Sequence, residues 1–142
     1  MKSFVLTLLA FVAAYAFCSA QMHKQTVHRT FVVENITQVR LQLTGNVEIR
    51  ETKGSRVLVE ITAAAAVPNE AMMNFLVENG RYEVASDVDA TAGTLTLTTQ
   101  KPKNVLMVKG QECKEEISYV VYLPASIKFV NKEVSTSSNS KP

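Results

Sequence analysis

The sequence predicts a mainly β protein: an antiparallel β-sandwich or roll of roughly seven to nine short strands, with one short helix at about residues 70–79 packed on a sheet. The first observation behind this prediction is the alternation of apolar and polar residues in many short runs, which is typical of half-buried strands. The second is the spacing of turn-forming Gly, Pro, Asn and Asp residues, which separate these runs about every ten residues. The third is a single segment, NEAMMNFLVENG at 69–80, whose apolar residues follow a helical spacing instead.

The first twenty residues have the pattern of a secretory signal peptide. They carry one positive charge at Lys2, an apolar run over 4–14 and small residues near the end. The apolar run is shorter than the ~20 residues that a membrane helix needs, so we expect no transmembrane segment in the mature chain. We therefore expect an exported protein, located in the periplasm, the cell envelope or outside the cell.

The cleavage site is predicted after Ala20, which would leave Gln21 as the first residue. Cleavage after Ala16 satisfies the same rule of small residues and remains an alternative. Lipid attachment at Cys18 is a further alternative, although Phe17 stands where a lipoprotein signal would have a small residue.

Removal of residues 1–20 would leave a nearly neutral chain. Lys2 is the only charged residue of that segment, so fourteen Lys and Arg would remain against thirteen Asp and Glu, a net charge of +1. This balance lacks the basic character of nucleic-acid-binding proteins, so we expect no nucleic acid partner. Only Cys113 would remain, which excludes an intramolecular disulfide. We place a single β-rich domain at 21–130 and a polar, disordered tail at 131–142.

The N-terminal half predicts four strands. The segment at 26–33 places valine and phenylalanine on one face, with Arg29 as the exception. The segments 39–43 and 47–51 alternate on either side of a glycine turn, and 56–62 alternates after the turn sequence TKGS. We expect 47–51 and 56–62 to pair as the clearest hairpin of the chain.

The helical segment has a start signal and a stop signal. Asn69 can cap the first turn, Glu70 lies at the positive end of the helix dipole, and Gly80 follows where a left-handed residue is needed. We expect a broad apolar face to pack on a sheet; its members are Met72, Met73, Phe75, Leu76 and Val77. The solvent-facing side would carry Glu70, Asn74 and Glu78.

The C-terminal half predicts further strands. The segments 81–84 and 94–99 are expected to pair across the polar loop between them, and 104–110 reads as another strand. The segment 117–123, ISYVVYL, is apolar on both faces and is therefore expected at the centre of a sheet. A last short strand is expected at 126–130.

The sequence predicts no catalytic arrangement and no cofactor, so we expect a protein that is not an enzyme. Of the two histidines, His23 and His28, the second lies in a predicted strand and has no recognised nucleophile partner. Asp87 and Asp89 alternate as calcium ligands do, but the other residues of an EF-hand loop are missing, so a solvated loop is favoured. Cys113 either packs as a small apolar residue or, if exposed, forms an intermolecular disulfide.

One conditional metal site is predicted at the mature terminus. If Gln21 is the first residue, His23 is the third, and the free amine with the histidine can hold Cu(II) or Ni(II) in a square-planar set of nitrogen ligands. Cyclisation of the terminal glutamine would remove the amine and with it the site.

The segments ENGRYEV, TLTL and EEISYVVYLPASIKFV, in this order, resemble the head GIN-type domains, a family of secreted bacterial domains of unknown function regarded as adhesin heads. In that family, strands of the form VEI and LTL precede a segment that ends in VYLP and a small residue, as LVEIT, TLTLT and VVYLPASIKF do here. The resemblance covers about 26–130 and corresponds to the N-terminal part of the family's domain, which usually continues into rungs of parallel β-structure. It implies an adhesin-like role and supplies no catalytic or ligand motif.

Two functions are consistent with the sequence. The first is an exported, non-catalytic surface or envelope domain that contacts a protein or a glycan. The second is a small periplasmic carrier of a metal ion or an apolar ligand, with the helix closing a pocket over the sheet. A hydrolase is disfavoured, because the polar residues do not converge on a recognised arrangement.

Overall fold

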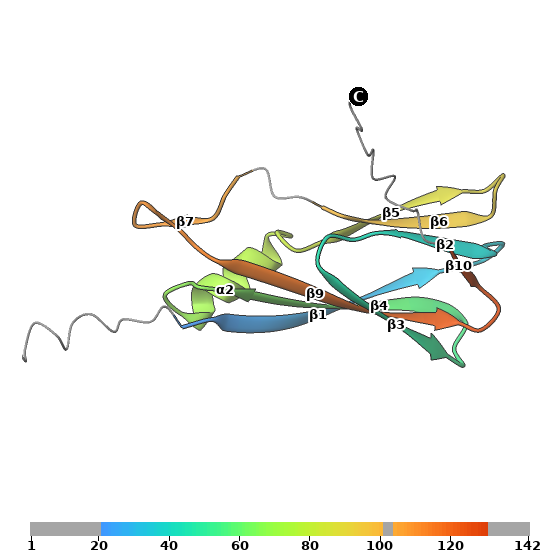
Figure 1. Ribbon diagram of the computed structural model, residues 1–142, viewed down its shortest axis with the longest axis horizontal. Coiled ribbons are helices and arrows are strands. Elements are labelled where there is room, and N and C mark those ends of the chain that lie inside the picture. Colours follow the sequence, from blue (N-terminus) through green and yellow to red (C-terminus); the bar gives the residue numbers. More distant parts are fainter. Residues whose placement is uncertain (1–20, 101–103, 131–142) are drawn as a thin grey trace, which may run out of the picture.

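The computed structural model describes residues 21–100 and 104–130. The predicted signal peptide at 1–20 and the predicted disordered tail at 131–142 lie outside the described residues. The described part contains ten strands and one helix, and the mainly β fold with a single helix is confirmed. Two four-stranded sheets face each other, and the helix lies beside one end of the longer sheet (Figure 1).

The longer sheet, called sheet A, has the strand order β1-β4-β9-β3. Its members are β1 (His23–Val32), β4 (Arg56–Ala65), β9 (Glu115–Pro124) and β3 (Asn46–Thr52). The pairs β1 with β4 and β4 with β9 are antiparallel, whereas β3 runs parallel to β9. The position of β9 between two neighbours confirms that ISYVVYL lies in the interior of a sheet.

The second sheet, sheet B, has the order β10-β2-β6-β5. Its members are β10 (Lys128–Val130), β2 (Gln38–Gln42), β6 (Thr94–Thr99) and β5 (Val84–Asp89). The strands β10, β2 and β6 are parallel, and β5 pairs with β6 in the antiparallel sense. Both sheets are thus mixed, whereas an antiparallel arrangement was expected. The partner strand of β6 was expected at 81–84, and this position is wrong: β5 begins at Val84 and occupies most of the segment that was expected to be a loop. The predicted strand at 104–110 is reduced to β7 (Met107–Val108), which pairs with β8 (Gln111–Glu112).

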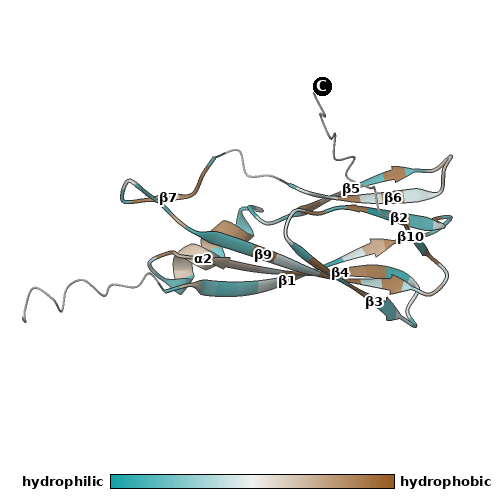
Figure 2. Ribbon diagram, viewed as in Figure 1, coloured by the Kyte–Doolittle hydropathy of each residue, from teal (hydrophilic) through white to brown (hydrophobic). Residues whose placement is uncertain are grey.

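The core lies between the two sheets. Hydrophobic colour concentrates on β4 and the adjoining part of β9, the two central strands of sheet A (Figure 2). The largest fully buried side chains come from both sheets and the helix: Tyr119, Ile61, Val57, Val59 and Val121 from sheet A, Leu95, Leu97 and Val39 from sheet B, and Met73 from the segment 70–78. The hydroxyl of Tyr119 is 3.0 Å from Thr99 Oγ1, so the one polar atom of this ring is satisfied across the core.

The hairpin expected between β3 and β4 does not form. The two strands follow each other in the chain, but β9 lies between them and pairs with both: Val121 is opposite Ile49 on one side and Val59 on the other. A strand that is apolar on both faces is stabilised most by neighbours on both sides, and this outweighs the local preference of the TKGS turn. The prediction of the hairpin is therefore wrong, although both strands exist.

The glycine turn before β3 carries the chain from sheet B to sheet A, so the strands on its two sides do not pair. Gly45 has a φ of +137°, and a Cβ atom at this position would lie 2.5 Å from the carbonyl oxygen of Ile117. Only glycine fits both the backbone conformation and the close approach of β9.

The helix α2 (Glu70–Glu78) starts and ends as predicted. Asn69 Oδ1 accepts a hydrogen bond from the Met72 amide at 2.9 Å, and Gly80 has a φ of +74°. Gln25 of β1 lies opposite Ala63 of β4 and donates to Asn74 of the helix at 2.6 Å. The helix thus covers the end of sheet A where β4 has alanines instead of larger residues.

The predicted apolar face of α2 is too broad. Met73 and Leu76 are buried, but the Phe75 side chain is 61% exposed. Phe75 lies two positions after Met73, and two steps of about 100° place it on the opposite side of the helix. The expectation that Phe75 packs in the core is therefore wrong.

Candidate binding surfaces

The outer face of sheet A, which points away from sheet B, carries an open hollow of about 600 Å³. We call it the trough. Its lining comes from β1, β4, β9 and the start of β3, and consists of Met22, Lys24, Gly45, Asn46, Thr62, Ala64, Glu116, Ile117 and Ser118. Its volume lies within the range of ligand pockets in proteins, although it is open where such pockets are usually enclosed.

Strand register explains why this surface is hollow. Ala64 of β4 lies opposite Lys24 of β1 on one side and Glu116 of β9 on the other. Two strand spacings place the backbones of Lys24 and Glu116 about 10 Å apart, with only a methyl group between their long side chains. The trough therefore has a short apolar floor and two walls of opposite charge.

The next row of the sheet supplies hydrogen-bonding groups. Thr26, Thr62, Ser118 and Asn46 lie opposite one another across all four strands. The hydroxyls of Thr26 and Thr62 are 3.3 Å apart. Hydroxyls donate and accept, and the Asn46 amide does both, so this row can pair with a ligand that carries donors and acceptors together.

Lys114, two residues before Glu116, favours the ionised form of the Glu116 carboxyl. Lys114 Nζ lies 2.7 Å from Glu116 Oε1, and this hydrogen bond lowers the pKa of the Glu116 carboxyl and raises the pKa of Lys114. Both side chains are mainly exposed. Glu116 is thus a carboxylate at neutral pH that water and ligands can reach.

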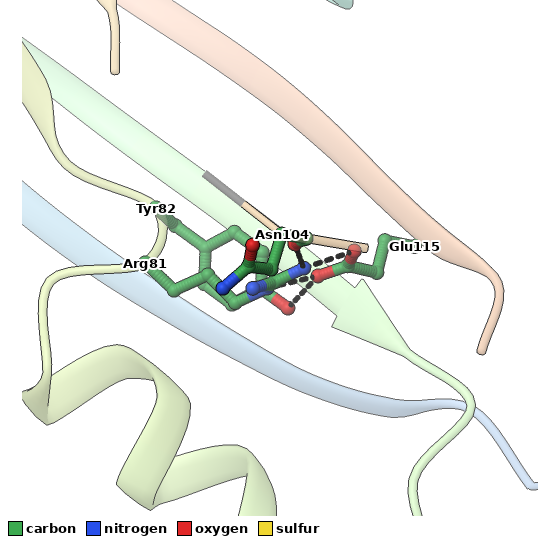
Figure 3. A network of polar contacts seen from close by, with 4 residues as sticks. All are labelled: Arg81, Tyr82, Asn104 and Glu115. Atoms are coloured by element: carbon green, nitrogen blue, oxygen red, sulfur yellow. Dashed lines mark hydrogen bonds and ion pairs between the residues drawn. The ribbon is translucent and has the colours of Figure 1, made fainter. Parts of the chain in front are cut away.

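A partly buried polar network holds the end of β9 from which the trough residues project (Figure 3). Arg81 donates to both carboxylate oxygens of Glu115, at 2.6 and 2.8 Å, and to the carbonyl oxygen of Asn104. The Tyr82 hydroxyl donates to the same carboxylate at 2.8 Å. Glu115 directly precedes Glu116, so the network fixes the position of one wall of the trough.

The network shifts the pKa values of Glu115 and Tyr82 and raises that of Arg81 through the hydrogen bond to Glu115. Burial raises the pKa of Glu115, but the hydrogen bonds from Arg81 and Tyr82 outweigh it, and the net pKa is lowered. Burial, followed by the hydrogen bond to Glu115, raises the pKa of Tyr82 far above its ordinary range. The network therefore contains a carboxylate, a guanidinium and a neutral phenol at all moderate pH values.

His28 lies on the same outer face, one row beyond the hydroxyls. Its Nε2 is 3.3 Å from a carboxylate oxygen of Glu60, its partner across β1 and β4. Within residues 21–100 and 104–130, the ring has no hydrogen bond to a hydroxyl or a thiol. A nucleophile activated by this histidine is thus not assembled in the described part of the chain.

A second hollow, of about 330 Å³, lies at the side of the sandwich. We call it the lateral groove. Five residues with apolar side chains line it, together with their polar backbone groups: Leu41, Leu43, Val47, Ile49 and Phe129. It opens between β3, which is the last strand of sheet A, and β10, which is the last strand of sheet B. Neither the trough nor the lateral groove is lined by the helix, so neither is the helix-covered pocket expected for a carrier.

The residues that the sequence singled out are scattered. His23 is the first residue of β1 and lies opposite Ala65, partly buried, which leaves the conditional copper site a prediction. Asp87 and Asp89 lie in β5 and not in a loop, and Asp89 Oδ1 accepts from the amides of Thr91 and Ala92 at 3.0 Å in the following turn. No group of three or more His, Cys, Asp or Glu side chains suited to a metal ion occurs in the described part.

Cys113 is half-buried and packs against the core, as the apolar alternative expects. Its amide donates to the Leu106 carbonyl at 2.8 Å, which joins the two ends of the β7–β8 hairpin.

The trough residues escaped sequence reasoning because they belong to four strands that are distant in the chain. The sequence contains one signal of the trough, which is the small residue Ala64 at an outward-facing position of its strand. That signal gains meaning only when the register of Ala64 between two charged residues is known.

Comparison with known proteins assigns no family to the chain. No family model and no curated protein matches the chain. One solved structure, described as a "putative adhesin" from Bacteroides fragilis, is similar at 16% sequence identity with a TM-score of 0.33. The similarity covers 75% of this chain and 41% of that protein, so the chain spans less than half of the longer protein. Among the described residues, no helix is long and apolar enough to cross a membrane.

Proposed function

We propose that the chain is an exported, non-catalytic domain that binds a glycan through the trough on sheet A. The observation that carries this proposal is the row of short polar side chains beside an apolar floor. Thr62 and Ser118 offer hydroxyls, and Asn46 offers an amide. In the next row, Ala64 forms the floor between the charged walls, Lys24 and Glu116. Sugars present hydroxyl groups around an apolar ring face, and this set of donors, acceptors and a methyl group is complementary to them.

The shape of the trough supports an extended ligand. It is open to solvent, whereas sites for small cofactors usually bury most of the ligand in an enclosed pocket. A chain of sugar units can lie along the sheet and exchange hydrogen bonds with successive rows.

The binding test uses the mature protein on an array of glycans. Filling the floor by Ala64→Leu is expected to weaken binding by about tenfold or more, which corresponds to about 1.4 kcal/mol. The control is Thr30→Leu, an exposed position on the same face of β1 that does not line the trough. Capture of a protein partner by cross-linking in the producing cell, together with no binding across the array, would contradict the glycan proposal.

Export is part of the proposal and has a separate test. The intact mass of the protein recovered from outside the cytoplasm is expected to match a chain that begins at Gln21. A mass lower by one ammonia would show a cyclised glutamine and remove the copper site at His23. A mass that includes residues 1–20 would contradict export with cleavage.

A further inference from the structure

We propose that two copies of the chain associate side by side through β3, which would join their two A sheets into one continuous sheet and close the lateral groove. The strand β3 is an edge: β9 pairs with one side of it, and no described strand pairs with the other. Such an edge presents free backbone amides and carbonyls that another strand can bind.

The two sides of the sandwich are closed differently. At the side of β1 and β5, Arg29 on the inner face of β1 donates to the Glu83 carboxylate, with Nε to Oε2 at 2.9 Å. At the other side, the space between the sheets is lined by apolar residues that stay partly exposed, among them Val47 at 39%, Ile49 at 40% and Phe129 at 40%. Exposed apolar residues gathered in a groove are typical of an interface.

The charges of β3 select its partner. The outward face of the strand carries Glu48 and Arg50, and its inward face carries Val47, Ile49 and, towards the end of the strand, Glu51. In an antiparallel pair of two β3 strands centred on Ile49, Glu48 of each copy lies opposite Arg50 of the other. Registers centred on Glu48 or Arg50 place like charges opposite each other, which is unfavourable. The strand is thus complementary to itself in one register.

That register also uses the whole strand. β3 comprises the seven residues from Asn46 to Thr52, and Ile49 is the middle one. All seven therefore find partners, with Asn46 opposite Thr52 at both ends. On the inner face, the two Ile49 side chains would lie opposite each other at the centre, and Val47 of each copy would lie opposite Glu51 of the other. The two lateral grooves would thus meet at an apolar centre, with the Glu51 carboxylates at its two ends.

The competing interpretation is that Glu48 and Arg50 only protect the edge. They already form an ion pair within the strand, with Arg50 Nε 2.7 Å from Glu48 Oε1, and charged residues on edge strands discourage pairing. The two interpretations differ in what happens when charges are changed in different copies, because only an interface can be restored by mixing two chains.

The experiment measures mass by analytical ultracentrifugation of the mature protein, with reductant present so that Cys113 forms no disulfide. The wild type is expected to sediment with twice the mass of one chain. Glu48→Arg and Arg50→Glu each place like charges opposite each other in the dimer and are expected to give single chains. An equimolar mixture of these two variants is expected to give a dimer again, because the two arginines of the first variant's strand then face the two glutamates of the second variant's strand.

Val32→Arg is the control, since Val32 is exposed on β1 at the far edge of the same sheet, and it is expected to remain a dimer. A wild type that stays a single chain at all soluble concentrations overturns the proposal, and binding of an apolar fluorescent probe to that single chain would assign the groove to a ligand. A dimer that survives both charge variants, or a mixture that stays monomeric, overturns it as well.

Discussion

Arg29 and Glu83 form an ion pair at one side of the sandwich. Arg29 is the only charged residue at an inward-facing position in the middle of β1, between Val27 and Phe31. Its guanidinium contacts both carboxylate oxygens of Glu83, which directly precedes β5. Arg29, which interrupts the apolar inward-facing positions of β1, therefore links the edges of the two sheets.

This ion pair is expected to contribute little to stability. The side chains of Arg29 and Glu83 are 41% and 29% exposed, so solvent screens their attraction. A double-mutant cycle with Arg29→Met and Glu83→Gln should give a coupling energy of about 0.5 to 1 kcal/mol by urea unfolding, decreasing with added salt. A coupling energy several times larger would mean that the pair is screened much less than its exposure implies.

The Glu115 network is expected to contribute more. Glu115→Ala leaves the guanidinium of Arg81 and the hydroxyl of Tyr82 without their acceptor, and should lower the free energy of unfolding by about 3 kcal/mol. Glu116→Ala, at the next and exposed position, should leave the free energy of unfolding nearly unchanged. Equal effects of the two variants in chemical unfolding would argue against the network.

The same carboxylate predicts a pH dependence. The pKa of Glu115 in the folded protein is below its ordinary value of 4.5. The ionised carboxylate therefore contributes its full stabilisation of the folded protein above pH 4.5, and this stabilisation is lost as the pH falls through the lowered pKa. Wild type and Glu115→Gln should therefore differ in thermal stability at neutral pH and converge in acid. A difference that persists unchanged to low pH would mean that the charge of Glu115 is not what stabilises the network.

Two neighbouring positions of the helix test how it packs. Leu76 is buried, and Leu76→Ala should cost about 2 to 4 kcal/mol in chemical unfolding. Phe75 is exposed, and Phe75→Ala should cost about 0.5 kcal/mol or less despite the larger side chain. The reverse order would indicate that the helix is rotated about its axis.

A substitution at Gly45 tests the turn that connects sheet B to sheet A. Gly45→Ala combines a strained backbone with a contact of 2.5 Å to the Ile117 carbonyl, and should destabilise the fold by about 2 kcal/mol or more. Gly54→Ala is the control, because a Cβ atom there meets only ordinary contacts with Thr52. Similar midpoints of thermal unfolding for the two variants would contradict the close approach of β9 to the turn.

The features that depend on neighbouring residues could be predicted from the sequence, and those that depend on distant ones could not. Asn69 and Gly80 mark the helix because capping is local. The antiparallel partner of β6 was also expected just before it in the chain, although β5 lies at 84–89 and not at 81–84. The hairpin between β3 and β4 failed because β9, which follows much later in the chain, binds both strands. Phe75 was assigned to the core because composition gives the width of an apolar face but not its direction.

The trough shows the same limit. Lys24, Ala64 and Glu116 come together only through the pairing of three strands. Each residue alone looks like an ordinary surface position, and no spacing in the sequence connects them. A site built across a sheet requires the register, which the alternation of a single strand does not contain.

The most direct test of the central claim is amide chemical-shift mapping of the mature protein during titration with the glycan that binds best on the array. Glycan binding in the trough predicts that the largest changes occur at Asn46, Thr62, Ala64 and Ser118, and that residues of the lateral groove are unaffected. Changes centred on Ile49 and Phe129, or no change at saturating glycan, would contradict it.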